Sequence, residues 1–403
     1  MSQTPAARPP GASPSTDKVA HLRPTTPGHI DQPCDPTRAR STAVVYCEGD
    51  FGAGDGKTAN GLVRHSEKYE ILSVIDSTKS GLDSGEVLGD APNDIPICAD
   101  LAESIALAGD VPDFFIFGKA PSSGMLSPVE RRLVLEAMSL GMNVVNGLHE
   151  FLNDDPEFAA AGAAAGVTLL DVRRPRPKKD LRVFSGRIFD VTCPRIAVLG
   201  TDGAIGKRTT ATLVTQALNA AGIKAVMVGT GQTSLIQGAA HGAALDAIAP
   251  QFCSGEMEAA VVDAFEAEHP DVIIVEGQGA LSHPAYLTSA YILRGSLPAG
   301  VILQHAPRRV RLGDFAGFPM PTPASEINLI QTFADTRVIG LTINHEDMTD
   351  ADVDEAIDAY ELELGIPVTD ALTRSPDRLV AMVLAAFPAL APAADVETAD
   401  APT

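Results

Sequence analysis

A glycine-rich stretch around Lys207 has the composition of a loop that binds phosphate. Residues 200–211 read GTDGAIGKRTTA, follow the apolar run 196–199 and precede the helix-like sequence LVTQALNAAG. A strand, a glycine-rich turn with a lysine and then a helix gather backbone N–H groups and a positive charge around one anion. The candidate cofactor-binding residues are Gly200, Thr201, Asp202, Gly203, Ala204, Ile205, Gly206, Lys207, Arg208 and Thr209.

Arg208 distinguishes this loop from a Walker A motif. In that motif a serine or threonine that holds magnesium follows the lysine. An arginine removes this ligand and adds a cation that pairs with phosphate directly. The loop therefore suits a phosphate compound that is held without a metal ion, and we predict no metal site. Thr209 would restore metal binding if the helix started one residue later, which leaves ATP with magnesium as an alternative.

Three further residues are candidates for catalysis. Glu276 ends the apolar run of VIIVEGQGAL (272–281), at the carboxyl end of a strand, where open α/β sheets bind ligands. His283 lies in SHPAY, where Tyr286 can donate a hydrogen bond. A carboxylate and an imidazole are groups that act as general bases in catalysis, so Glu276 and His283 are the candidate bases. A solvated strand end and a structural histidine are the alternatives.

Cations that suit an acidic substrate occur in HAPRRVR (305–311). Arg308, Arg309 and Arg311 have the donor geometry that binds carboxylates, although a solvated loop that offsets acidic neighbours has the same composition. His149 follows a strand of the first half, where it could line an interdomain cleft or cap the next helix. We include these four residues as candidate substrate-binding residues.

A second lysine loop, GDFGAGDGKTANGLVRH (49–65), also follows an apolar run. Phe51 stands where Walker A needs its first glycine, and Lys57 stands at the third glycine of the dinucleotide pattern. The sequence therefore leaves two readings of this loop open, a plain turn into a helix and a ligand loop.

Apolar runs alternate with helical patterns along the chain, which predicts two tandem doubly wound α/β domains. The basic, proline-containing segment 172–187 separates the domains, which we place at 41–186 and 187–388. Residues 1–40 and 389–403 are expected to be disordered, because they are rich in proline and small polar residues. The expected strands lie at 43–47, 71–76, 114–118, 143–147 and 167–171, and then at 195–200, 224–231, 271–277, 300–305, 337–344 and 366–370.

Composition narrows the classes of partner. The 403 residues carry a formal charge of −22, which disfavours nucleic acid and anionic membranes as partners. No apolar stretch approaches the ~20 residues that span a bilayer, and the N-terminus lacks the apolar centre of a secretory signal. The five cysteines contain no C-x-x-C pair, which argues against a zinc site. We expect a cytoplasmic homo-oligomer that acts on a small molecule.

The sequence also resembles two groups of known proteins. GTDGAIGK resembles the GTDTxVGK loop of dethiobiotin synthetase-like P-loop proteins, and VIIVEGQGAL resembles their later strand, whose glutamate faces the phosphates. Residues 43–388 resemble the D-glutamate N-acetyltransferase-like family, formerly a domain of unknown function. The motifs that carry this resemblance are KTANGL (57–62), VNGLHEFLNDDPEF (145–158), DVRRP (171–175), GTDGAIGKRTT (200–210), TGQTSLIQG (230–238), EGQGALSHPAY (276–286) and HAPRRVR (305–311).

The family resemblance implies a Rossmann-like N-terminal domain and a P-loop NTPase-like C-terminal domain. It also implies transfer of an acetyl group from acetyl-CoA to the amino group of D-glutamate. Ala280, Ser282 and the segment 286–296 depart from the family pattern near the substrate side, so the acidic acceptor is the less secure part of this expectation. The alternatives are an ATP- and magnesium-dependent ligase or kinase of the dethiobiotin synthetase type and a nucleotide-sensing P-loop protein.

Overall fold

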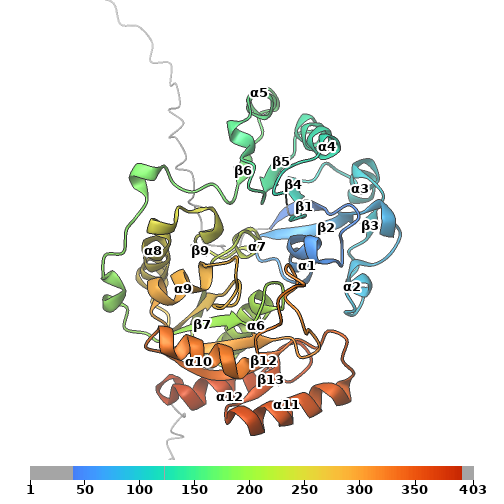
Figure 1. Ribbon diagram of the computed structural model, residues 1–403. Coiled ribbons are helices and arrows are strands. Elements are labelled where there is room, and N and C mark those ends of the chain that lie inside the picture. Colours follow the sequence, from blue (N-terminus) through green and yellow to red (C-terminus); the bar gives the residue numbers. More distant parts are fainter. Residues whose placement is uncertain (1–39, 122, 393–403) are drawn as a thin grey trace, which may run out of the picture.

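The computed structural model describes residues 40–121 and 123–392, so the predicted disordered ends lie almost wholly outside the described residues. The chain folds into two α/β units, each built on one sheet whose strands pair in parallel (Figure 1). This architecture confirms the predicted fold class.

The first sheet has the strand order β3-β2-β1-β4-β5-β6, which is the order of the dinucleotide-binding fold. Its strands are β1 (Ser41–Tyr46), β2 (Tyr69–Ile75), β3 (Ile97–Cys98), β4 (Phe114–Phe117), β5 (Asn143–Asn146) and β6 (Leu169–Asp171). Its helices are α1 (Lys57–Arg64), α2 (Ser84–Val87), α3 (Leu101–Ala108), α4 (Pro128–Ser139) and α5 (Pro156–Ala165).

Alternation along the strands sends side chains to two separate cores. In β1, Val44 and Tyr46 face α3, α4 and α5, whereas Ala43 and Val45 face α1. Local signals fix the helix ends. Ser127 and Glu130 form a reciprocal capping box at the start of α4, so satisfying N–H groups that the helix itself leaves unpaired.

The second sheet has the order β13-β12-β11-β7-β10-β8-β9, so β7, which leads into the P-loop, lies between β11 and β10. Helices α6 and α12 cover one face, and α8, α9, α10 and α11 cover the other. The strands are β7 (Arg195–Gly200), β8 (Ala225–Gly229), β9 (His241–Gly242), β10 (Val272–Glu276), β11 (Gly300–His305), β12 (Arg337–Ile343) and β13 (Val368–Asp370). The helices are α6 (Lys207–Ala220), α7 (Gln232–Gln237), α8 (Pro250–Glu268), α9 (Thr288–Ser296), α10 (Pro323–Phe333), α11 (Asp350–Leu364) and α12 (Asp377–Ala386).

Helix α7 joins the two units. All of its residues are buried, and Ile236 belongs to the core beneath the first sheet. Thr233 Oγ1 lies 2.9 Å from Thr58 Oγ1 of α1, and Gln237 Nε2 donates to the carbonyl oxygens of Gly61 at 2.6 Å and His65 at 2.7 Å. Figure 1 shows α7 beside α1 between the two sheets. The units therefore share a packed, hydrogen-bonded interface.

The basic segment between the units packs along α8. Arg182 Nη1 donates to Asp263 Oδ2 at 3.0 Å, and the backbone N–H groups of Ser185 and Gly186 donate to Glu258. Acidic side chains of α8 thus anchor the segment by charge-assisted hydrogen bonds. Within residues 40–121 and 123–392, none of the helices has the length and apolar character needed to cross a membrane.

Candidate functional site

The loop between β7 and α6 exposes a row of backbone N–H groups. Ala204 and Gly206 adopt left-handed φ angles of 48° and 100°, which turn the chain sharply before Lys207. The first helical hydrogen bond runs from Thr210 N to Gly206 O at 2.9 Å. Within the described part of the chain, the N–H groups from Ala204 to Thr209 have no acceptor. Such a row at a helix N-terminus binds anions, because the N–H dipoles converge there.

Lys207 supplies a desolvated cation to the same loop. Its side chain is buried, and Nζ donates to the carbonyl oxygen of Asp202. Burial lowers the pKa of Lys207 to about 7, while the carboxylates of Asp202 and Glu276 act in the opposite direction. A bound phosphate would replace the lost solvation and stabilise the charged ammonium group.

The Arg208 side chain packs against helix α1. A Cβ atom at Gly61 would lie 2.4 Å from Arg208 Nη2, so the guanidinium group occupies the space that this glycine leaves. Burial lowers the pKa of Arg208, and Glu276 opposes that shift. The described residues include no hydrogen-bond or ion-pair partner for this side chain. Arg208 is therefore a cation available to a ligand.

The arginines predicted to bind substrate have protein partners instead. Arg309 forms two 2.9 Å hydrogen bonds to Glu346 and a third, of 3.0 Å, to Asp202 Oδ2. Arg308 pairs with Asp352 at 2.7 Å, and Arg311 is exposed beside the carbonyl group of Gly317. Arg309 thus fixes the P-loop through Asp202. The sequence-based prediction took these arginines as free cations because their acidic partners lie far away in the sequence.

Glu276 lies beneath the cations of the P-loop and is buried. Its Oε2 accepts from the backbone N–H of Thr230 at 2.8 Å and from Ser234 Oγ at 2.6 Å. Thr230 precedes α7, and Ser234 lies within it. The carboxylate therefore ties the carboxyl end of β10 to the helix that joins the two units.

His283 and Tyr286 do lie together, as the sequence suggested. Their rings stack with centroids 4.4 Å apart and an interplanar angle of 16°, and the Tyr286 hydroxyl donates to Asp314 at 2.7 Å. His283 Nδ1 accepts from Ala285 N at 3.2 Å, so the proton of the neutral ring resides on Nε2. Burial lowers the pKa of His283, which favours that neutral form.

One ring nitrogen of His283, Nε2, makes no hydrogen bond to the described residues. Nε2 is buried and lacks a hydrogen-bond partner in the described residues, and its nearest carboxylate oxygen, Asp202 Oδ1, is 3.9 Å away. Glu326, which the sequence reading missed, supports this segment by accepting from Ser282 Oγ at 2.6 Å. The ring is therefore held as an unsatisfied hydrogen-bond donor next to the P-loop.

Four charged or titratable residues form a second group, the interdomain cluster, which consists of Lys57, His149, Arg173 and Asp246. Arg173 donates to Asp246 Oδ2 from Nη2 at 2.9 Å and from Nε at 3.1 Å, and His149 Nε2 lies 4.0 Å from the same oxygen. Lys57, His149 and Arg173 follow the carboxyl ends of β1, β5 and β6, the edge at which such sheets bind ligands.

Lys57 connects this cluster to the P-loop. The Lys57 side chain is accessible to solvent, but the surrounding protein partly desolvates it and so lowers its pKa. The charge of Arg173 lowers this pKa further. The Lys57 charge also lowers the pKa of Lys207 and that of His149. The second lysine loop therefore faces the first across the interface, a relation that its imperfect motif could not reveal.

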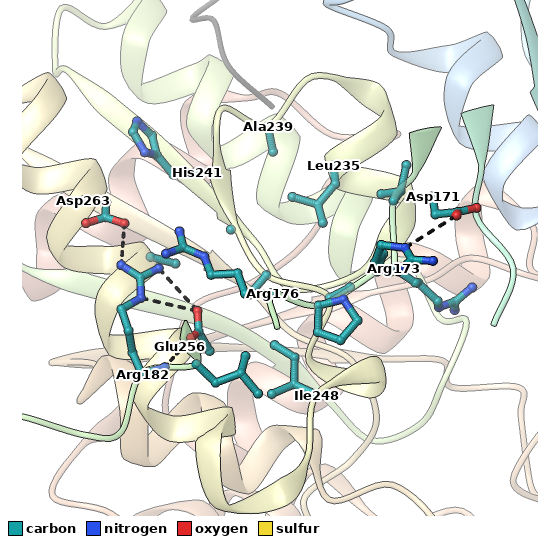
Figure 2. Close-up of a pocket in the computed structure, with 18 of the residues that line it drawn as sticks. Asp171, Arg173, Arg176, Arg182, Leu235, Ala239, His241, Ile248, Glu256 and Asp263 are labelled. Carbon is teal, nitrogen blue, oxygen red and sulfur yellow. Dashed lines mark hydrogen bonds and ion pairs between the residues drawn. The ribbon is translucent and has the colours of Figure 1, made fainter. Parts of the chain in front are cut away.

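A separate pocket of about 930 Å³, including its open mouth, lies between the segment 170–182 and α8 (Figure 2). Its charged lining is largely paired, because Arg182 contacts both Glu256 and Asp263 and Arg173 contacts Asp246. The P-loop does not line this pocket. We therefore place the candidate site between the P-loop and the interdomain cluster, where the unpaired groups lie.

Comparison with known proteins identifies the family. A model described as the P-loop domain of a domain of unknown function, DUF1611, matches residues 182–380, and its Rossmann-like N-terminal counterpart matches residues 77–175. The chain belongs to the DUF1611 family. A crystal structure of a DUF1611 family protein from Anabaena variabilis covers 86% of this chain and 100% of its own, with a TM-score of 0.79 and 28% sequence identity.

Two curated relatives of this chain carry the name D-glutamate N-acetyltransferase. The protein from Pseudoalteromonas sp is 31% identical over 274 residues, which is 66% of this chain and 80% of the relative. The protein from Tritonibacter scottomollicae is 30% identical over 276 residues, which is 66% of this chain and 79% of the relative. These matches confirm the family resemblance seen in the sequence.

Proposed function

We propose that this protein is an acyl-CoA-dependent N-acetyltransferase that acetylates the amino group of D-glutamate or a similar acidic amino acid. The observation that carries the proposal is the combination of free N–H groups from Ala204 to Thr209, the desolvated Lys207 and the unpaired Arg208. The names of the two curated relatives support the same reaction.

The P-loop is the proposed site for the phosphates of coenzyme A. Its N–H groups and Lys207 neutralise a diphosphate, and Arg208 stands where a magnesium-dependent loop has a hydroxyl ligand. An arginine pairs with a phosphate directly and repels a divalent cation. The donor therefore binds without a metal ion in this proposal.

His283 is the proposed donor to the thioester carbonyl oxygen. When the amine attacks the carbonyl carbon, a C–N bond forms and negative charge develops on that oxygen; collapse of this tetrahedral intermediate then restores the carbonyl group, breaks the C–S bond and frees a second proton from the nitrogen. A neutral imidazole with its proton on Nε2 stabilises this charge by a hydrogen bond. The tautomer argues against His283 as the base, because its other nitrogen already accepts from Ala285.

His149 is the proposed base that removes a proton from the acceptor's ammonium group. Its side chain is 51% exposed, and burial together with the charge of Arg173 lowers its pKa, so the ring is neutral near pH 7. Glu276 instead holds Thr230 and Ser234, which suits a role in ordering the site. The released thiolate takes up the second proton that the nitrogen loses, which gives coenzyme A.

A direct assay tests the proposed function. The full chain is incubated with acetyl-CoA and a panel of D- and L-amino acids, while free thiol is followed by absorbance and the acetylated product by mass spectrometry. We expect thiol release that depends on D-glutamate. No acetylated product from any amino acid, together with substrate-dependent formation of ADP from ATP and magnesium, would favour the ligase or kinase alternative instead.

A further inference from the structure

The interdomain cluster places both signs of charge at the carboxyl edge of the first sheet. We infer that Lys57 binds a carboxylate, and Asp246 the ammonium group, of the amino-acid acceptor. The Rossmann-like unit and its interface would then supply the acceptor site, and the P-loop the donor site. This inference rests on the proposed function and adds the residues that recognise the second substrate.

Lys57 combines a fixed backbone with a free side chain. The loop that leads to it is held by buried Asp76, which accepts from the N–H groups of Gly49 at 3.1 Å and Phe51 at 3.3 Å. The next residue, Thr58, is fixed by its 2.9 Å contact with Thr233. Across residues 40–121 and 123–392, no ion pair or hydrogen bond engages the Lys57 ammonium group. Because the backbone around Lys57 is already fixed, binding of an anionic group has to order only the side chain of this unpaired cation.

Asp246 provides the complementary charge. Its Oδ2 receives both donors of Arg173, which orients the carboxylate, while its Oδ1 has no donor in the described chain. The side chain is 26% exposed, so a small molecule can reach it. Arg173 is itself held by the carbonyl group of Gly147 and by Gln232 Oε1 at 2.8 Å. The free oxygen of Asp246 is therefore fixed in position.

The mixture of charges favours the amino acid over the phosphates of the donor. A carboxylate next to the binding cation disfavours a phosphate, which carries only negative charge. An amino acid carries a carboxylate and an ammonium group a few atoms apart, so it satisfies Lys57 and Asp246 together. His149, within 4.0 Å of Asp246, is then placed next to the ammonium group that must lose its proton.

Kinetics of the full chain separate the two substrates. We expect Lys57→Met and Asp246→Asn each to raise the KM for D-glutamate roughly 10- to 100-fold, as for loss of a charge-assisted hydrogen bond, and to leave the KM for acetyl-CoA nearly unchanged. Lys224→Met is the matched control, because its side chain is 53% exposed and lies before β8, away from the site. A rise in the KM for acetyl-CoA with no change for D-glutamate would overturn the inference.

Two amides of D-glutamate identify the carboxylate that Lys57 binds. The wild-type protein should discriminate against the side-chain amide, the α-amide or both, and Lys57→Met should abolish the discrimination against at least one. Lys57→Arg should restore part of it, which shows that the charge matters and that the variant folds. Full wild-type discrimination against both amides in Lys57→Met would contradict the assignment.

Calorimetry distinguishes failure of this inference from failure of the proposed function. If the wild-type protein binds D-glutamate but transfers no acetyl group, the proposed function fails, and weaker D-glutamate binding by Lys57→Met still supports the acceptor site. If the wild-type protein acetylates D-glutamate and Lys57→Met binds it as tightly as the wild type does, the acceptor assignment fails and the proposed function stands.

Discussion

The guanidinium group of Arg208 fills the space beside Gly61, a residue of the other unit. A Cβ atom at Gly61 would lie within 2.4 to 2.8 Å of three guanidinium atoms. Arg208 follows the P-loop lysine, and Gly61 lies in α1, which starts at Lys57. The Rossmann-like unit therefore determines where a cation of the P-loop points, and the site depends on both sheets.

This contact predicts the effect of adding one methyl group. Gly61→Ala should displace Arg208 and weaken acetyl-CoA binding about tenfold, because a charge-assisted contact with phosphate is lost. The control is Gly54→Ala in the same loop, where a Cβ atom would meet nothing within 4 Å. Isothermal titration of both variants checks the prediction. Equal acetyl-CoA affinity in the two variants would show that Arg208 does not contact the donor.

Lys207 predicts a proton linked to donor binding. With its pKa lowered to about 7, roughly nine in ten Lys207 side chains are neutral at pH 8, and a bound phosphate raises that pKa. Acetyl-CoA binding at pH 8 should therefore take up close to one proton, and affinity should fall as pH rises above 7. Calorimetry in two buffers of different ionisation enthalpy measures this uptake. Lys207→Met should abolish it, and uptake that persists in the variant would refute the assignment.

His283 predicts a loss of turnover with binding preserved. His283→Phe keeps an aromatic ring against Tyr286 but removes the Nε2 donor, so kcat should fall about 100-fold, as for other donors to a developing oxyanion. Tyr286→Phe keeps the stacking and loses only the hydrogen bond to Asp314, so its effect should be smaller. A His283→Phe defect confined to acetyl-CoA affinity would exclude a role in the chemical step.

The strands and the P-loop could be predicted from local sequence. The run 195–200 forms β7 over Arg195–Gly200 because six consecutive residues carry the signal of a buried parallel strand. Strands β3 and β9 have two residues each, which is too short for such a signal. Helix α7 gives no clear local signal because it is short and polar, and Thr233 and Gln237 find their partners in the other unit. Contacts between distant segments leave no periodic pattern.

The candidate site could be predicted only in part, because some of its residues come together through contacts between distant segments. Glycines and a lysine around residue 207 form a local pattern, and the structure brings Glu276 and His283 to that loop. Asp246 and Glu326 had no comparable signal, because they are two among 52 acidic residues. Lys57 stood in an imperfect motif, and only the interface between the units shows what it faces.

His305 predicts how stability responds to acid. Burial lowers its pKa to about 4, below the value of about 6.5 in the unfolded chain. Between pH 4 and pH 6.5 the unfolded chain therefore binds more protons than the folded chain. The free energy of unfolding falls by up to about 3 kcal/mol as pH falls from 6.5 to 4. His305→Asn, which can keep a hydrogen bond to Thr201, should flatten this dependence in urea unfolding. An unchanged slope in the variant would assign the acid sensitivity to other groups.

In the proposed function, the P-loop holds the donor's phosphates without a metal ion. The most direct test of this proposal is a calorimetric titration of the full chain with acetyl-CoA in EDTA and in magnesium, beside ATP under the same two conditions. We expect acetyl-CoA to bind in EDTA with an affinity that magnesium changes by less than about twofold. Tight binding of ATP only with magnesium, and no binding of acetyl-CoA, would contradict it.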